Sequence, residues 1–390
     1  MGMYIGVGRK ARQCFGFDDV ALVPGSLTLN PEEVDTTWEI GGKQFSVPIV
    51  ASAMDGVVDV KFAIAMGKLG SFAVLNLEGV QTRFDDPAEV LDRIGSANPQ
   101  ESTQLLQKIY EAPILPELIA KRVKEIKAGG APAVVSAIPQ RAAEFGPIAA
   151  KAGCDIFVVQ STVVTVRHES TAYETLDFKK FFKEMHDLGV PVMVGNTSTY
   201  QVTYDLMEAG ADAVFVGVGP GAACTTRGVL GIGVPQITTT VDTAYARDRF
   251  HKMAGRYIPI ITDGGMRVGG DLCKAFAAGA DAVMIGSPFA KSFEAPGRGY
   301  HWGMATPHAN LPRGTRVHVG QNASLEQILF GPAELDDGSQ NLMGALATCM
   351  GNLGAHCIKE MQNAEIIIAP SIKTEGKLLQ RVQNIGMASR

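Results

Sequence analysis

The sequence predicts an α/β protein built as a (β/α)8 TIM barrel, and three observations support this fold class. First, short apolar runs bounded by Gly, Pro, Asn or Asp recur along residues 48–286. Second, helix-like stretches such as Thr199–Glu208 and Gly270–Ala278 separate these runs, and this alternation is typical of βα units. Third, eight runs fall within 239 residues (48 to 286 inclusive), close to the ~250 residues of a typical barrel.

The eight candidate strands are continuous runs rich in Val, Ile, Phe and Ala. This composition is expected of strands that are buried on both faces of a parallel sheet. A doubly wound open sheet can be built from the same units and is the alternative fold. In chain order the candidates are Pro48–Ala53, Ser71–Leu75, Ala131–Ala137, Asp155–Val159, Pro191–Gly195, Ala211–Gly217, Tyr257–Thr262 and Ala280–Gly286.

A weak internal repeat supports the βα interpretation. Ala209–Gly217 (AGADAVFVG) and Ala278–Gly286 (AGADAVMIG) are near-copies, and Ala152–Val159 (AGCDIFVV) is a looser third copy. Each copy has the pattern of a helix end, a glycine turn and then a strand. We therefore expect residues 1–390 to form a single catalytic barrel domain with extensions at both ends.

Composition and charge exclude several classes of function. The chain has 390 residues, with 35 Lys+Arg against 40 Asp+Glu and a formal net charge of −5. No basic surface for nucleic acid or an anionic membrane is therefore expected. The uncharged run at residues 338–358 contains Asn, Gln, Thr and His, so it predicts a buried helix rather than a membrane span. Six scattered cysteines without a CxxC pair indicate reduced thiols and a cytoplasmic location.

In a barrel, the chemistry lies where the strands end and the βα loops begin. Polar or glycine residues occupy almost every predicted strand end, as expected for a site that binds a polar ligand. These residues are Ser52–Met54, Asn76, Ser136, Gln160–Thr162, Asn196, Gly217–Cys224, Asp263–Gly265 and Gly286–Ser287.

The loop Gly217–Arg227 (GVGPGAACTTR) contains a candidate nucleophile, Cys224. Glycines at 217, 219 and 221 allow positive φ, so that backbone groups can turn inward and hold a small ion or a phosphate. A thiolate is the strongest nucleophile among the side chains at neutral pH. An arbitrary cysteine is more often an inert buried residue, but a glycine-rich strand end favours a catalytic one.

Two further loops have features of a phosphate site. In Asp263–Gly270 (DGGMRVGG), Asp263 can accept hydrogen bonds from a ribose diol, and Gly265 permits close approach of a ligand. The glycine pair that ends this loop opens a helix whose N-terminal amides suit an anion. Gly286–Ser287 follows the eighth strand, and the last two barrel loops often bind phosphate. Either loop alone is more simply a tight turn, whereas two adjacent loops favour a phosphate site.

The run Gly297–Gly314 (GRGYHWGMATPHANLPRG) lacks helix and strand periodicity. We expect a mobile lid over residues 297–316, and an ordinary surface loop is equally consistent with the pattern.

These motifs together resemble the inosine-monophosphate (IMP) dehydrogenase/guanosine-monophosphate (GMP) reductase family. The matching segments follow the family order over nearly the whole chain. They are Phe17–Pro24 (FDDVALVP), Ser52–Asp55 (SAMD), Gly195–Asn196, the Cys224 loop, DGGM from Asp263, GADAVMIGS ending at Ser287, Gly303–Met304 and Leu342–Ala355 (LMGALATCMGNLGA).

The resemblance implies an enzyme that acts on a purine mononucleotide with NAD and K+. Cys224 would add to purine C2, hydride would leave for NAD, and the thioimidate would be hydrolysed to xanthosine monophosphate (XMP). Thr226 matches a threonine near the reacting water, and the family assembly implies a homo-oligomer, a tetramer. The resemblance implies nucleotide contacts for Ser52, Met54, Asn196, Asp263, Gly265, Gly286, Ser287, Gly303 and Met304. It implies dinucleotide contacts for Gln160, Ser161, Thr162 and Asn196, and K+ contacts for Gly219, Gly221 and Cys224, with Glu375 and Gly376 from a neighbouring subunit.

Four departures from the family pattern bear on these implications. Val80–Lys127 is too short for the usual pair of regulatory CBS domains of at least ~50 residues each, so we expect the chain to lack them. Gln160 stands where dehydrogenases usually carry an aspartate, and Ala222 replaces a phosphate-binding serine. The lid has neither the adjacent Arg-Tyr pair of the dehydrogenases nor the glutamate-bearing segment of the reductases.

The missing Arg-Tyr pair leaves four candidates for activating the hydrolytic water: Arg313, Arg316, His308 and Thr226. An arginine can act as a base only where its environment opposes its charge, whereas a histidine accepts a proton near neutral pH.

The function expected from the resemblance is NAD-dependent oxidation of IMP to XMP in guanine nucleotide biosynthesis. Two alternatives remain, a GMP reductase-type activity and a nucleotide-binding regulatory paralogue without turnover. The absence of a lid glutamate counts against the reductase, and the departures at Gln160, Ala222 and the lid support the paralogue.

Overall fold

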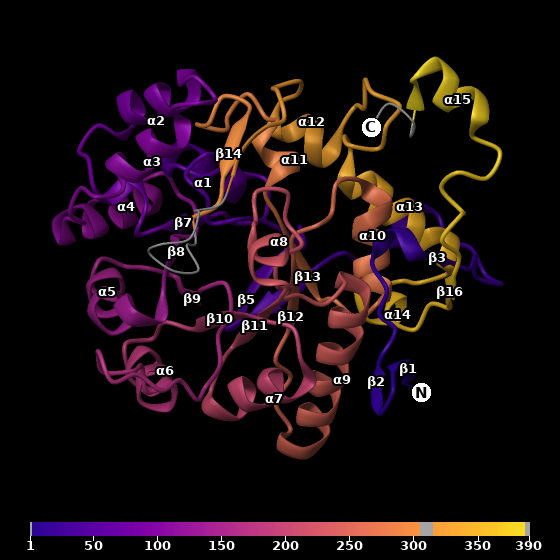
Figure 1. Ribbon diagram of the computed structural model, residues 1–390, viewed down its shortest axis with the longest axis horizontal. Helices are drawn as coiled ribbons and strands as arrows, with labels where there is room; N and C mark the ends of the chain where they lie inside the picture. The colour runs from indigo at the N-terminus through magenta and orange to yellow at the C-terminus, as the bar shows by residue number, and fades with distance from the viewer. Residues whose placement is uncertain (1, 305–314, 387–390) are drawn as a thin grey trace.

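A closed eight-stranded barrel forms the centre of the structure, a computed structural model that describes residues 2–304 and 315–386. The strand order is β6-β13-β12-β11-β10-β9-β8-β7, and helices surround the strands (Figure 1). The sheet closes because Ala51 of the first strand forms a parallel bridge with Ala73, which immediately precedes the second. The predicted TIM barrel is confirmed, and closure excludes the doubly wound sheet.

All eight predicted strands are present. Several begin up to three residues later than predicted, because the residues before them belong to the turn from the preceding helix. The strands are β6 (Ile49–Ala51), β7 (Val74–Asn76), β8 (Val134–Ala137), β9 (Ile156–Gln160), β10 (Val192–Thr197), β11 (Ala213–Val216), β12 (Ile260–Asp263) and β13 (Ala282–Ile285).

At least one helix follows each strand and packs against the outside of the barrel. The helices that cover it are α1 (Val60–Lys68), α4 (Pro116–Ala128), α5 (Pro139–Lys151), α6 (Phe178–Asp187), α7 (Tyr200–Ala209), α9 (Gln236–Ala254), α10 (Gly269–Ala277) and α13 (Leu342–Leu353). Shorter helices are α8 (Thr226–Leu230), α11 (Ser287–Ala290), α12 (Leu325–Phe330), α14 (Ile358–Met361) and α15 (Leu378–Gln383). The helix predicted within residues 338–358 is α13, and no helix in the described ranges has the length and hydropathy to cross a bilayer.

The repeated AGxD-type segments have one structural role. In each copy a glycine with φ between +98° and +120° ends the helix. The next aspartate then accepts a backbone hydrogen bond at the start of the neighbouring strand, so the repeat ties adjacent strands together at the amino end of the barrel. These pairs are Asp155 with Ala133 (2.8 Å), Asp212 with Val192 (2.7 Å) and Asp281 with Ile260 (2.8 Å).

A small hairpin fills the amino end of the barrel. It consists of β4 (Trp38–Ile40) and β5 (Lys43–Phe45). The Trp38 and Phe45 rings pack on each other and on Phe72, with ring centroids 4.9–5.9 Å apart. The three rings belong to the same buried cluster as the inward-facing strand residues. The carboxyl end is therefore the open end of the barrel.

The two terminal extensions meet on one side of the barrel. Strand β3 (Val20–Leu22) pairs antiparallel with β16 (Ile366–Ile368), which joins segments from opposite ends of the chain. Minor elements of the N-terminal extension are the hairpin β1 (Met3–Gly6) and β2 (Arg9–Ala11), and the 3-10 turns η1 (Phe17–Asp19) and η2 (Pro31–Glu33).

Extra helices follow β7, where the family's regulatory domains would be inserted. The segment contains η3 (Val80–Thr82), α2 (Pro87–Ser96) and α3 (Ser102–Ile109). These helices pack against a second hairpin, β14 (Tyr300–Trp302) and β15 (Arg316–His318), which lies beside α2 in Figure 1. The buried Trp302 forms a cluster with apolar residues of both helices.

The expectation that residues 297–316 lack regular structure is therefore wrong for the described ends of this run. Residues 300–302 and 316 belong to β14 and β15, and Trp302 is fully buried, which an ordinary surface loop would not provide.

Candidate active site

The carboxyl ends of the barrel strands surround a cavity of about 850 Å³. Every residue for which the resemblance implies a nucleotide or dinucleotide contact lines this cavity, and so do Cys224 and Thr226. From the described residues these are Ser52, Met54, Gln160, Ser161, Thr162, Asn196, Cys224, Thr226, Asp263, Gly265, Gly286, Ser287, Gly303 and Met304. The cavity volume is within the range of small-molecule sites.

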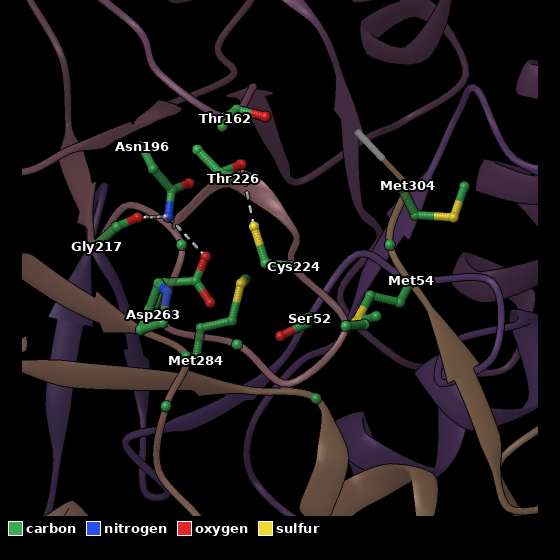
Figure 2. A pocket seen from close by; sticks show the side chains of 18 of the residues that line it. Ser52, Met54, Thr162, Asn196, Gly217, Cys224, Thr226, Asp263, Met284 and Met304 are labelled. Atoms are coloured by element: carbon green, nitrogen blue, oxygen red, sulfur yellow. Dashed lines mark hydrogen bonds between the residues drawn. The ribbon is translucent and has the colours of Figure 1, made fainter. Parts of the chain in front are cut away.

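Cys224 is exposed to the cavity and lies beside Thr226. The Cys224 thiol donates to the Thr226 hydroxyl oxygen at 3.3 Å, and Thr226 is buried at the start of α8. Figure 2 shows the Cys224 sulfur directed at this hydroxyl, with Ser52 and Met54 on another side of the cavity. A free thiol that faces open space meets the access requirement for a cysteine nucleophile, and the Thr226 hydroxyl is its hydrogen-bond acceptor.

Two of the three glycines in the Cys224 loop have the predicted backbone conformation. Gly217 has φ +131° and Gly219 has φ +75°. A Cβ at Gly217 would lie 2.3 Å from the Nε2 of Gln236, which donates to the Val216 and Asp263 carbonyls. Gly221 does not have positive φ, so that expectation is wrong. The residue instead begins a turn in which its carbonyl accepts from the Cys224 amide at 3.0 Å.

Asp263 is the centre of a partly buried polar cluster at the ends of three strands. Its Oδ2 accepts from the Asn196 amide at 2.8 Å and from the Gln160 amide at 3.2 Å. Gln160 also donates to the Asn196 side-chain oxygen at 2.9 Å, and Asn196 donates to the Gly217 carbonyl at 2.9 Å. Burial raises the pKa of Asp263 to about 6, against the opposing effect of the Asn196 hydrogen bond. The cluster presents a carboxylate acceptor to the cavity, as a ribose diol requires.

The glycine–serine loop after β13 lines the cavity, but the helix start after Asp263 does not. Gly286 lies against Met54, because a Cβ there would be 3.0 Å from the Met54 sulfur. In contrast, neither Gly269 nor Gly270 lines the cavity. The Gly269 amide donates to the Gly338 carbonyl at 3.0 Å, and buried Asp271 accepts from the Arg267 amide at 3.0 Å. The glycine pair is therefore not placed to contact an anion bound in the cavity.

Arg316 lies outside the cavity and holds the lid hairpin. Its guanidinium donates to the carbonyls of Ile94, Gly95 (3.3 Å) and Ala97 (2.7 Å) at the end of α2. It also lies over the Tyr300 ring, 4.4 Å from the centroid. A guanidinium with these partners is a structural cation rather than a base, so Arg316 is not placed to activate water. Two other candidates, His308 and Arg313, lie outside the described residues.

Several cavity-lining residues were not predicted, and Glu78, Arg83, Gln140 and His301 are among them. Glu78 follows the end of β7 by two residues and accepts from the Ile138 amide at 2.9 Å. In the sequence, its place two residues after a predicted strand end was the only sign that Glu78 could line the cavity. His301 lies in β14, within the run interpreted as a lid, where no motif distinguished it.

The K+ donor set implied by the resemblance is incomplete in one chain. Carbonyl oxygens are the ligands that K+ prefers, and Gly219, Gly221 and Cys224 offer three in one loop. Glu375 and Gly376 are exposed in the C-terminal segment and do not line the cavity. Among residues 2–304 and 315–386, no group of three or more His, Cys, Asp or Glu side chains could hold a metal ion.

Comparison with known proteins gives consistent similarities over most of the chain. A family model described as "IMP dehydrogenase / GMP reductase domain" matches residues 14–376. An uncharacterized oxidoreductase of Mycolicibacterium smegmatis is 37% identical over 93% of this chain and 99% of its own length. The inosine-5'-monophosphate dehydrogenase of Methanocaldococcus jannaschii is 26% identical over 94% and 95%. A solved IMP dehydrogenase/GMP reductase-like protein of Corynebacterium glutamicum superposes with a TM-score of 0.88 at 34% identity, covering 94% of this chain and 97% of that one.

Proposed function

The chain belongs to the IMP dehydrogenase/GMP reductase family, and on that premise we propose that it oxidises IMP to XMP with NAD. The observation that carries this proposal is the exposed Cys224 thiol beside Thr226 in a cavity that the Asp263 cluster and the Gly286–Ser287 loop also line, at the ends of two adjacent strands. A thiol nucleophile, a ribose acceptor and a loop suited to phosphate, which follow three successive strands, fit a purine mononucleotide.

In the proposed reaction, Asp263 accepts the ribose hydroxyls and the Gly286–Ser287 loop holds the 5'-phosphate. This placement brings purine C2 to the Cys224 sulfur. The Cys224 thiol releases its proton to water in the cavity and forms an S–C2 bond, and the C2 hydrogen leaves with its electron pair as hydride. When bound, NAD supplies the hydride acceptor. Water then adds to C2, and one of its protons passes by way of the Thr226 hydroxyl to purine N3. The S–C2 bond breaks as the sulfur takes up the other proton, which releases XMP and the free thiol.

The cavity walls offer places for the dinucleotide, although Gln160 is engaged with other residues. Ser161 and Thr162 follow β9 and line the cavity with Gln140. The Gln160 amide is already directed at Asn196 and Asp263. We therefore propose that Ser161 and Thr162, rather than Gln160, contact the nicotinamide nucleotide.

We also propose K+ binding, a homo-oligomeric state and a cytoplasmic location. Three loop carbonyls can contribute to a K+ site, and a neighbouring subunit can complete it. Leu378, Leu379 and Val382 of α15 are more than 70% exposed, as expected of a segment that packs against another copy. All six cysteines are free, which agrees with a reducing compartment.

A GMP reductase-type activity is the second candidate, and Glu78 favours it. Reductive deamination has no hydrolytic step and needs a group that protonates the departing ammonia. The dehydrogenase Arg-Tyr pair is absent from the lid, and Glu78 places a carboxyl group at the cavity wall. This arrangement supplies the acid that the sequence of the lid lacks.

One experiment separates these readings. The purified chain is incubated with IMP plus NAD or NADP, and separately with GMP plus NADH or NADPH, in the presence of K+. Chromatography quantifies XMP in the first incubation, and IMP and ammonia in the second. XMP formation that Cys224→Ala abolishes and Cys14→Ala preserves supports the proposal. Ammonia release from GMP assigns the reductase reaction instead, and tight nucleotide binding without any product indicates a regulatory paralogue.

A further inference from the structure

His301 is a buried histidine whose two ring nitrogens differ in their surroundings. It lies in the middle of β14 and is 1% exposed. Its Nε2 lies 2.9 Å from the Ser287 hydroxyl oxygen. Its Nδ1 is buried and has no hydrogen-bond partner in the part of the chain that the structure describes. His301 and Ser287 both line the cavity.

The backbone of β14 holds this ring in place. Side chains alternate along a strand, so Tyr300 and Trp302 face α2 and α3 while His301 faces the other way. Gly56 allows β14 to pass close to the loop after β6, because a Cβ there would lie 2.6 Å from the Tyr300 carbonyl oxygen and 2.8 Å from the His301 Cα. The His301 backbone is therefore held close to the loop after β6, and its buried ring faces Ser287.

The lack of a partner at Nδ1 determines where the ring proton resides. A neutral imidazole has one N–H donor and one acceptor nitrogen. A proton on Nδ1 would bury a donor with no acceptor, which costs about 1–3 kcal/mol and is rare in proteins. A second proton would have the same cost, and burial indeed lowers the pKa of His301 to about 4. The proton therefore lies on Nε2, which donates to Ser287.

This hydrogen bond also fixes the direction of the serine proton. A hydroxyl has one donor and two acceptor lone pairs. When the Ser287 oxygen accepts from His301, its own O–H must point elsewhere, and Ser287 faces the cavity. A hydroxyl donor aimed into a cavity suits a ligand oxygen that carries negative charge.

We propose that His301 is a positioning residue that aims the Ser287 hydroxyl, as a donor, at the phosphate of a nucleoside monophosphate. The identity of the ligand rests on the proposed function, and the role of His301 extends it. A phosphate monoester presents only acceptor oxygens when fully ionised, so it is complementary to a hydroxyl whose proton is already directed into the cavity.

Calorimetric titration of the full chain with IMP, inosine and ribose 5-phosphate tests this role without turnover. We expect His301→Phe to weaken binding of both phosphate ligands about 10-fold or more, while the affinity for inosine stays within about twofold of wild type. His301→Gln, which keeps an N–H near the same place, should recover most of the loss. His318→Phe is the matched control, since His318 is exposed on β15 and stacks on Tyr300.

Ser287→Ala provides the coupling test. If His301 acts through Ser287, the double variant binds IMP with about the same affinity as whichever of the two single variants has the lower affinity. Additive losses, equal weakening of inosine binding by His301→Phe, or unchanged IMP binding would each overturn the inference. A wild-type chain that binds IMP and does not oxidise it would refute the proposed function and leave this measurement interpretable.

Discussion

The Gln160 amide and the Asp263 carboxylate are joined by a 3.2 Å hydrogen bond at the open end of the barrel. The family pattern places an aspartate at position 160. In this chain a carboxylate so close to Asp263 would bring two negative charges together, and the amide avoids this repulsion while supplying a donor. In this chain, charge repulsion would therefore oppose a carboxylate at position 160 while Asp263 is ionised.

Replacing this amide with an isosteric carboxylate should destabilise the protein at alkaline pH. In Gln160→Glu, the two carboxyl groups cannot both ionise without mutual repulsion. We expect a loss of about 1–3 kcal/mol in the free energy of unfolding at pH 8, and a smaller loss at pH 5, where the pair shares a proton. Urea denaturation at both pH values measures this loss in the free energy of unfolding. Gln160→Met removes the amide without adding charge, and an equal loss in both variants would contradict the explanation.

Ionisation of Asp263 should lower the free energy of unfolding, so that this group makes the protein less stable above pH 6 than below pH 4. Its pKa of about 6 in the folded state exceeds the ~3.9 of an unfolded aspartate. The folded state therefore binds more protons between these values, and stability falls as pH rises through this window. We expect Asp263→Asn to be more stable than wild type by about 1–2 kcal/mol at pH 8. This figure is below the full shift because one side of the group opens to the cavity.

The stability advantage of Asp263→Asn should shrink progressively from pH 6 towards pH 4. Chemical denaturation across pH 5–8 follows this change. A constant difference at all pH values would show that Asp263 is not the titrating group. The same variant should bind nucleotide more weakly, because an amide accepts ribose hydrogen bonds less strongly than a carboxylate.

Thr226 should act on turnover rather than on binding. Its hydroxyl lies 3.3 Å from the Cys224 sulfur, where a proton acceptor for the reaction is needed. Thr226→Val keeps the shape and removes the hydroxyl, so we expect kcat to fall about 100-fold or more with KM within about threefold. Thr226→Ser should recover activity. If Thr226→Ser is as inactive as Thr226→Val, the methyl group and not the hydroxyl is what matters.

Arg316 should affect the lid and not the chemical step. Arg316→Leu leaves three carbonyls at the end of α2 without their donor, and we expect a loss of about 1–3 kcal/mol and a raised KM. The control is Arg298→Gln, which breaks an exposed 2.6 Å pair with Asp92 and should cost less than about 1 kcal/mol. A collapse of kcat at constant KM in Arg316→Leu would restore Arg316 as a candidate base.

The sequence was sufficient to predict the barrel because its signals are local. Each strand is a short apolar run, and each AGxD-type segment combines a helix end, a turn and an aspartate whose partner is the neighbouring strand. The cavity residues at strand ends followed from the same reasoning, since strand ends converge at one end of any closed barrel.

The lid and its partners could not be predicted because they depend on contacts between distant segments. Three residues, Tyr300–Trp302, are too few for a periodic pattern, and their burial comes from α2 and α3, about 200 residues earlier. The partners of Arg316 and the unpartnered nitrogen of His301 arise in the same way. Gly221 shows a further limit: a glycine permits positive φ without requiring it.

The helices α2 and α3 lie between β7 and β8, where the family resemblance implies an insertion of regulatory domains, and they support the β14–β15 hairpin through Trp302 and Arg316. Insertion of a sensor domain into this segment would therefore remove the contacts that hold the hairpin in place. The same contacts link the surface of α2 and α3 to the cavity, because β14 packs on these helices through Trp302 and lines the cavity through His301. Small molecules or antibodies that bind this surface therefore become a route to inhibition that leaves the nucleotide pocket untouched.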